Sequence, residues 1–198
     1  MKLDTIHTIA AIIIGIFLAG CSSKSEFYQL KSDLKQTTQI SKKSVHSRIV
    51  GIAEVETSEY LQKPEIVTRY SDKHLNVHEV ERWAGSLEKN IQSVLRQNLE
   101  KLIPRYTFLS YPWEEPLSDA YRIYLHVDRY DGDSNGTVTM KGRWSLVRQS
   151  DNRAVVLENF NYTGRGGGKD TESIVDTQSK LLEKLSRHIA TQIERRIK

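Results

Sequence analysis

Cys21 is the only cysteine of this 198-residue chain, and it directly follows the apolar run 10–20. The residues Leu18-Ala19-Gly20-Cys21 match a bacterial lipobox, the pattern [LVI]-[AST]-[GA]-Cys. In this chemistry the thiol takes up a diacylglycerol, a peptidase cleaves between Gly20 and Cys21, and the new amine is acylated. The other interpretation is a lone buried cysteine behind an ordinary hydrophobic segment. The polar residues that follow favour the lipobox, so we predict a covalent diacylglycerol and an N-acyl lipid on Cys21 and no other cofactor.

The segment before the cysteine then reads as a signal peptide. Residues 1–20 would be removed and play no part in the fold. The apolar stretch 9–18 is too short to cross about 30 Å of hydrocarbon, which takes roughly 20 helical residues. Several acyl chains hold a protein firmly on a membrane. Ser22 stands where an inner-membrane retention signal usually has Asp, so we expect the protein at the periplasmic face of the outer membrane.

Other patterns that suggest chemistry fail on detail. The glycine-rich segment 164–170 lacks the spacing of a phosphate-binding loop, because Thr163 takes the place of the first glycine and Asp170 the place of the hydroxyl. We interpret it as a flexible hinge between a strand and a helix. His74 and His78 share a helical spacing of four, but a zinc protease needs a Glu directly after the first histidine and a third ligand. We therefore predict no metal site and place His78 on the surface at the start of a helix.

Neither charge nor motifs indicate an enzyme or a nucleic-acid-binding protein. The net charge is +4 with 27% charged residues, and the basic residues are interspersed with acids. Nucleic-acid binding requires a concentrated basic face. A nucleophile motif of the type G-x-S-x-G does not occur. Asp128, Asp131 and Asp133 lack the spacing and the final Glu of a calcium loop. We predict no catalytic residues.

These features leave a tether and one folded domain. We predict a tether and linker at 21–47, with a short docking strand near 27–30, and a single domain at 48–198. The apolar periodicity predicts strands and two amphipathic helices, the second beginning at the N-cap Asp170. The expected strands are 48–55, 65–70, 106–111, 121–130, 137–147 and 153–162, and the expected helices are 76–102 and the segment from 170. We predict an α+β fold, a two-layer sandwich in which a mostly antiparallel sheet is packed by two long helices.

Alternation in the hairpin 121–147 separates two faces. Val138, Met140, Trp144 and Leu146 should share one face, and Gly142 among them indicates a bulge or close packing. Exposed aromatic residues favour a binding surface. We place Tyr124 and Tyr130 on the second face and Trp113 in a proline-bounded loop, and we name Tyr130 and Trp113 as candidate partner contacts. The alternative is that these rings cover helices of the same domain.

Taken together, the motifs resemble those of the ABC-type transport auxiliary lipoproteins. In that family a Tyr-x-Leu follows the acylated cysteine, a Trp-Ala begins the long helix, and a Tyr-Asp-Gly … Gly-x-Trp hairpin precedes the last helix. The matching positions are Tyr28, Leu30, Trp83, Tyr130, Asp131, Gly132, Gly142 and Trp144.

The resemblance implies an accessory, non-enzymatic role in lipid transport between two membranes. The implied partner is an inner-membrane protein with MCE domains that spans the periplasm, and the lipoprotein would hold its outer-membrane end as a homo-oligomer. Two other functions stay open: a pilotin-like assembly lipoprotein for another envelope complex, and a periplasmic lipoprotein enzyme.

Overall fold

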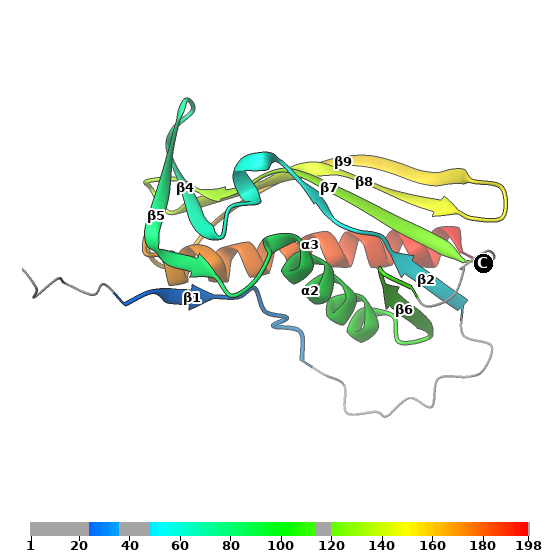
Figure 1. The fold of residues 1–198 in the computed structure, drawn as a ribbon. Helices are drawn as coiled ribbons and strands as arrows, with labels where there is room; N and C mark the ends of the chain where they lie inside the picture. Colours follow the sequence, from blue (N-terminus) through cyan, green and yellow to red (C-terminus); the bar gives the residue numbers. More distant parts are fainter. Residues whose placement is uncertain (1–23, 36–47, 114–119, 198) are drawn as a thin grey trace, which may run out of the picture.

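The computed structural model describes residues 24–35, 48–113 and 120–197. Their elements form two sheets and two long helices (Figure 1). A short 3₁₀ helix, η1, covers Glu59–Leu61.

The larger sheet has six strands. Its order is β6-β2-β7-β8-β9, and β3 pairs with β7 beyond the end of β2. Strand β2 runs parallel to β6 and β7, whereas β7, β8 and β9 form an antiparallel meander. The strands are β2 (Arg48–Ile52), β3 (Glu56–Thr57), β6 (Tyr106–Ser110), β7 (Tyr121–Gly132), β8 (Thr137–Arg148) and β9 (Arg153–Arg165).

The smaller sheet has the order β1-β5-β4. Its strands are β1 (Glu26–Tyr28), β4 (Glu65–Ser71) and β5 (His74–Trp83). The hairpin β4–β5 is antiparallel, and β1 adds to β5 in parallel at the end where β5 leaves the hairpin. Figure 1 shows this hairpin projecting at one end of the molecule, while the turn between β8 and β9 lies at the other end.

Two helices cover one face of the larger sheet: α2 (Leu87–Leu102) and α3 (Thr171–Arg196). Each begins at a side-chain cap, because the Ser86 hydroxyl oxygen accepts from the Lys89 N–H and the Asp170 carboxylate accepts from the Ser173 N–H. The predicted N-cap at Asp170 is thus confirmed. Between the helices the buried Asn98 side-chain amide donates to Ser186 Oγ at 3.1 Å.

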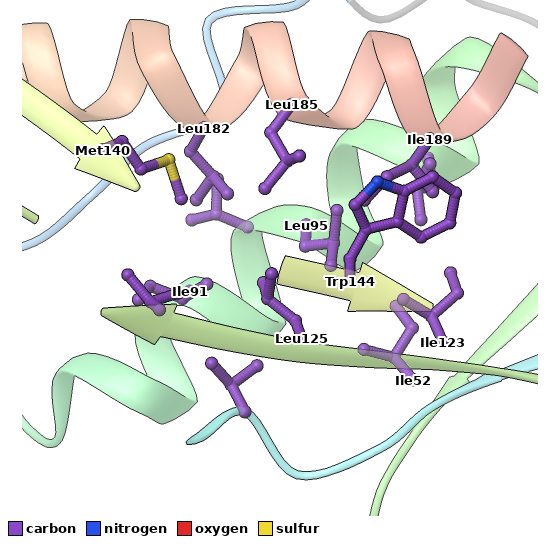
Figure 2. Close-up of a cluster of buried hydrophobic side chains, with 14 of the residues drawn as sticks. Ile52, Ile91, Leu95, Ile123, Leu125, Met140, Trp144, Leu182, Leu185 and Ile189 are labelled. Atoms are coloured by element: carbon purple, nitrogen blue, oxygen red, sulfur yellow. The ribbon is translucent and has the colours of Figure 1, made fainter. Parts of the chain in front are cut away.

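The core lies between the helices and the inner face of the larger sheet (Figure 2). Side chains of both helices meet side chains of β2, β7 and β8 there. The labelled members of this cluster are Ile52, Ile91, Leu95, Ile123, Leu125, Met140, Trp144, Leu182, Leu185 and Ile189. The expected α+β architecture, a mostly antiparallel arrangement packed by two helices, is confirmed.

The first helix is shorter than predicted. Residues 76–83 belong to strand β5, and α2 begins only at Leu87. His74 and His78 therefore lie on a strand, and Trp83 ends that strand instead of opening a helix. Gly85 separates the two elements. Its φ of 141° is a conformation that residues other than glycine rarely adopt.

Candidate functional site

The Asp131 carboxylate is fully buried, with 0% of the residue exposed, and it accepts hydrogen bonds from three side chains. Tyr60 donates its hydroxyl to Oδ2 at 2.7 Å. Arg69 donates from Nε and Nη2 at 3.3 and 3.0 Å, and Arg129 Nε donates to Oδ1 at 3.0 Å. The network joins η1, β4 and β7, so Asp131 ties the smaller sheet to the larger one.

The protonation states of the Asp131 network suit a structural role. Burial, followed by the charge of Asp131, raises the pKa of the Tyr60 hydroxyl, which keeps that group a donor. The hydrogen bonds to Asp131 raise the pKa of Arg69 and keep it charged. Each of these side chains is hydrogen-bonded within the fold.

Tyr130 is buried, with 1% exposed, so the prediction that its ring is exposed on the second face of the hairpin is wrong. Its hydroxyl donates to the Gln178 carbonyl of α3 at 2.5 Å, and the Gln178 side chain donates back to the Tyr130 carbonyl at 2.8 Å. An irregularity in the pairing between Val127 and Arg129 is the reason. It inserts one residue into β7, and an inserted residue reverses the alternation of side chains beyond it.

Two motif glycines permit close packing around this irregularity. A Cβ on Gly142 would lie 2.1 Å from the His126 carbonyl oxygen, and one on Gly132 would lie 3.0 Å from the Ile174 side chain. The expected close packing at Gly142 is confirmed. The remaining motif residues, Leu30, Trp83 and Trp144, are buried in the core, and Tyr28 packs against it.

Glycines before α3 also serve packing. A Cβ on Gly166 would lie 2.5 Å from Thr177 Oγ1, and one on Gly168 would lie 2.3 Å from an Asp170 carboxylate oxygen. Close approach accounts for both positions. The flexible hinge at 164–170 stays a prediction. The hydrogen bonds from Ser173 lower the pKa of Asp170, so the N-terminus of α3 is capped by its own carboxylate and is not arranged to take an anion.

Histidines and acids do not converge on a metal site. Within the described ranges, no cluster of three or more His, Cys, Asp or Glu side chains could hold a metal ion. His78 contacts Thr68 at 2.9 Å and Glu81 at 2.5 Å on the smaller sheet.

A cleft of about 970 Å³ lies between β3, the start of α2 and the segment 111–112. Several of its polar side chains are hydrogen-bonded within the fold. Thr57 donates to Glu88 at 2.5 Å, and Glu56 lies 3.2 Å from a ring nitrogen of His126. Ser86, which also lines the cleft, caps α2. The hydroxyl groups of Thr57 and Ser86 are therefore both used within the fold.

The outer face of the larger sheet carries exposed apolar side chains. Tyr124 and Leu157, 41% and 71% exposed, lie in one row across the strands, since each is opposite Ser145. Both helices lie on the other face (Figure 1). At one side of this row the Arg122 guanidinium stacks 4.6 Å from the centre of the half-buried Trp113 ring. We call Tyr124, Leu157, Ser145 and Arg122 the open sheet face; its aromatic and arginine content is typical of interfaces.

Gly20 and Cys21 lie outside the described residues, but the chain is fixed soon after them. Strand β1 pairs with β5 from Glu26 onward, and the Ala84 N–H donates to the Tyr28 carbonyl at 2.9 Å. The Leu30 N–H then donates to Asn90 Oδ1 at 3.0 Å. Neither described helix is both long and apolar enough to cross a membrane.

Solved structures share this fold. An uncharacterised protein superposes with a TM-score of 0.72 at 20% identity, over 86% of this chain and 99% of that one. A Xanthomonas campestris protein assigned to the family DUF330 gives 0.68 at 16% identity, over 84% and 93%. A PelC dodecamer from Paraburkholderia phytofirmans gives 0.42 at 12% identity, over 74% and 85%, a score too low to establish a common fold.

Sequence comparison identifies the family. No curated protein matches the chain. The family model described as the ABC-type transport auxiliary lipoprotein component matches residues 28–190, which include the motif residues from Tyr28 to Trp144. The chain therefore belongs to the ABC-type transport auxiliary lipoprotein family.

Proposed function

We propose that this protein is a non-enzymatic docking component of an MCE-type intermembrane lipid transport system. Acyl chains on Cys21 hold it at the periplasmic face of the outer membrane, in keeping with Ser22 after the cysteine. Its folded domain binds the periplasm-spanning MCE-domain protein, as the motif resemblance implies.

The open sheet face is the observation that carries this proposal. A protein that works by docking needs an apolar surface that its own fold leaves uncovered. Tyr124 and Leu157 supply such a surface. They lie on β7 and β9, and both strands are hydrogen-bonded to β8. Arg122 beside them supplies a polar rim. Trp113 stays a predicted contact at the edge of this face.

Site-specific crosslinking in the cell envelope tests the proposal. A photo-reactive amino acid replaces Tyr124 or Leu157 in the full-length lipoprotein, and captured proteins are identified by mass spectrometry. The same residue at Lys180, an exposed position on α3, is the control. We expect an MCE-domain protein from the two sheet positions and none from Lys180.

Two results would contradict the proposal in different ways. Capture of a secretion or pilus component at the sheet positions would favour the pilotin-like function. Capture of the MCE-domain protein through Lys180 alone would keep the function and move the docking surface to the helical side.

A further inference from the structure

We propose that the smaller sheet lies against the lipid surface and that Phe27 and Tyr70 are its contact residues. This inference rests on the acyl anchor of the proposed function but does not involve the partner protein. It assigns a membrane-facing end to the domain.

Chain length sets how far the domain can move from the bilayer. Cys21 and Glu26 are five residues apart in the sequence. Even a fully extended chain therefore places the start of β1 no more than roughly 17 Å from the acylated cysteine. Because β1 is hydrogen-bonded into the fold through Tyr28 and Leu30, the domain cannot swing away on a longer linker.

The elements nearest to that point belong to the smaller sheet. Glu26 pairs with Glu81 of β5, and β5 leads back from there to the tip of the β4–β5 hairpin at Ser71 and His74. At about 3.3 Å per residue, this tip lies roughly 23 Å from the start of β1 along the strand. Figure 1 places β1, the hairpin and the start of α3 at the same end of the molecule, away from the β8–β9 turn.

This end carries the two most exposed aromatic side chains among the described residues. Phe27 of β1 is 65% exposed and Tyr70 of β4 is 72% exposed. The Tyr70 ring meets the His74 ring edge-on at 5.7 Å, close to the hairpin turn. An aromatic ring with a polar group, such as that of Tyr70, favours the headgroup region of membranes. An apolar ring such as that of Phe27 is buried at the boundary between headgroups and acyl chains. A short tether keeps their local concentration near the bilayer high, so a weak intrinsic affinity suffices.

The charges of this end do not explain the contact. The hairpin turn combines Asp72 with Lys73, and at β1 the exposed Lys24 precedes Glu26, which pairs with Glu81. A surface of mixed charge gains little from anionic lipids. We therefore expect the same contact on vesicles with and without phosphatidylglycerol.

The single cysteine makes a direct test practical. When the Cys21 thiol is a thioether, a newly introduced cysteine is the only one that reacts with a thiol-specific dye. Full-length, acylated F27C, Y70C and L157C variants are labelled with an environment-sensitive fluorophore and reconstituted in phosphatidylethanolamine/phosphatidylglycerol vesicles. Leu157 is the matched control, since it is as exposed as Tyr70 but lies on β9 near the β8–β9 turn. Mass spectrometry first confirms the acyl chains.

We expect blue-shifted emission at positions 27 and 70, and loss of most of that emission when the vesicles contain spin-labelled lipid. The dye at position 157 should behave as in water. Equal quenching at all three positions, or quenching at 157 alone, would overturn the proposal, as would a Cys21 without lipid. If Y70C does not fold, K73C in the adjacent turn replaces it. No partner protein is present, so a failed docking proposal leaves this result unaffected.

Discussion

The two faces of the larger sheet differ in what they carry. The inner face holds the motif residues Tyr130, Gly142 and Trp144, all packed against neighbours within the fold. The outer face holds Tyr124 and Leu157, which belong to no motif and remain exposed. The motif residues on the inner face therefore serve packing, whereas the exposed residues of the outer face belong to none of these motifs.

Replacing Asp131 should have the largest effect on stability. Asp131→Ala leaves Arg69 and Arg129 without their buried carboxylate. Removing one partner of a buried ion pair costs about 3–5 kcal/mol, so the free energy of unfolding in urea should fall by that order. Asp151→Ala is the control, because it removes an exposed ion pair with Arg148 and should change little. Equal losses of unfolding free energy in both variants would show that the Asp131 network does not stabilise the contact between the two sheets.

Filling the space at Gly142 comes next. Gly142→Ala drives a Cβ into the His126 carbonyl oxygen, which only a backbone shift can relieve. Overpacking of this kind costs about 1–3 kcal/mol. Gly167→Ala is the matched variant, because nothing lies within 4 Å of its Cβ position. In thermal unfolding, the melting temperature of Gly142→Ala should be clearly lower than that of Gly167→Ala. Similar melting temperatures would contradict the close contact between Gly142 and the His126 carbonyl.

Tyr130→Phe should have a smaller effect, on stability and not on binding. It removes the hydroxyl donated to the Gln178 carbonyl and keeps the ring in the core. A net hydrogen bond is worth about 1 kcal/mol. We expect the free energy of unfolding in urea to fall by this amount, and partner capture to stay unchanged. A large drop in capture at unchanged stability would restore Tyr130 as a partner contact.

Leu157→Ser and Tyr124→Ser should barely change stability, since exposed substitutions stay within about 0.5 kcal/mol. Under the proposed function, pull-down of the MCE-domain protein should nevertheless be lost or strongly reduced. The contrast with Tyr130→Phe is the sharpest form of the comparison: a substitution on the inner face should change stability alone, and substitutions on the outer face should change binding alone. Full capture by the double variant would exclude the open sheet face as the docking surface.

Much of the fold was predictable from the sequence because its signals are local. The alternation in β8 and the apolar stripe of α3 each follow from one segment. The start of α2 was not, because Val80, Trp83 and Leu87 fit a helical spacing. The ladder partners that make β5 a strand come from β1 and β4. The local signal for this boundary is Gly85 before the cap Ser86.

The error at Tyr130 has the same origin. The alternation through Ile123, Leu125 and Val127 predicts an outward Tyr130, and only the irregularity in the pairing with β8 reverses it. The network around Asp131 was also out of reach, since Tyr60 and Arg69 come from segments whose proximity depends on how the two sheets meet.

Helix α3 gives a scale for how far the fold extends from its N-terminal strand. It runs along the length of the domain (Figure 1) and has 26 residues, which gives about 39 Å. Under the proposed acyl anchor on Cys21, the tether before β1 adds no more than roughly 17 Å to this length. A partner that reaches the protein across a wider gap must then supply the remaining length itself.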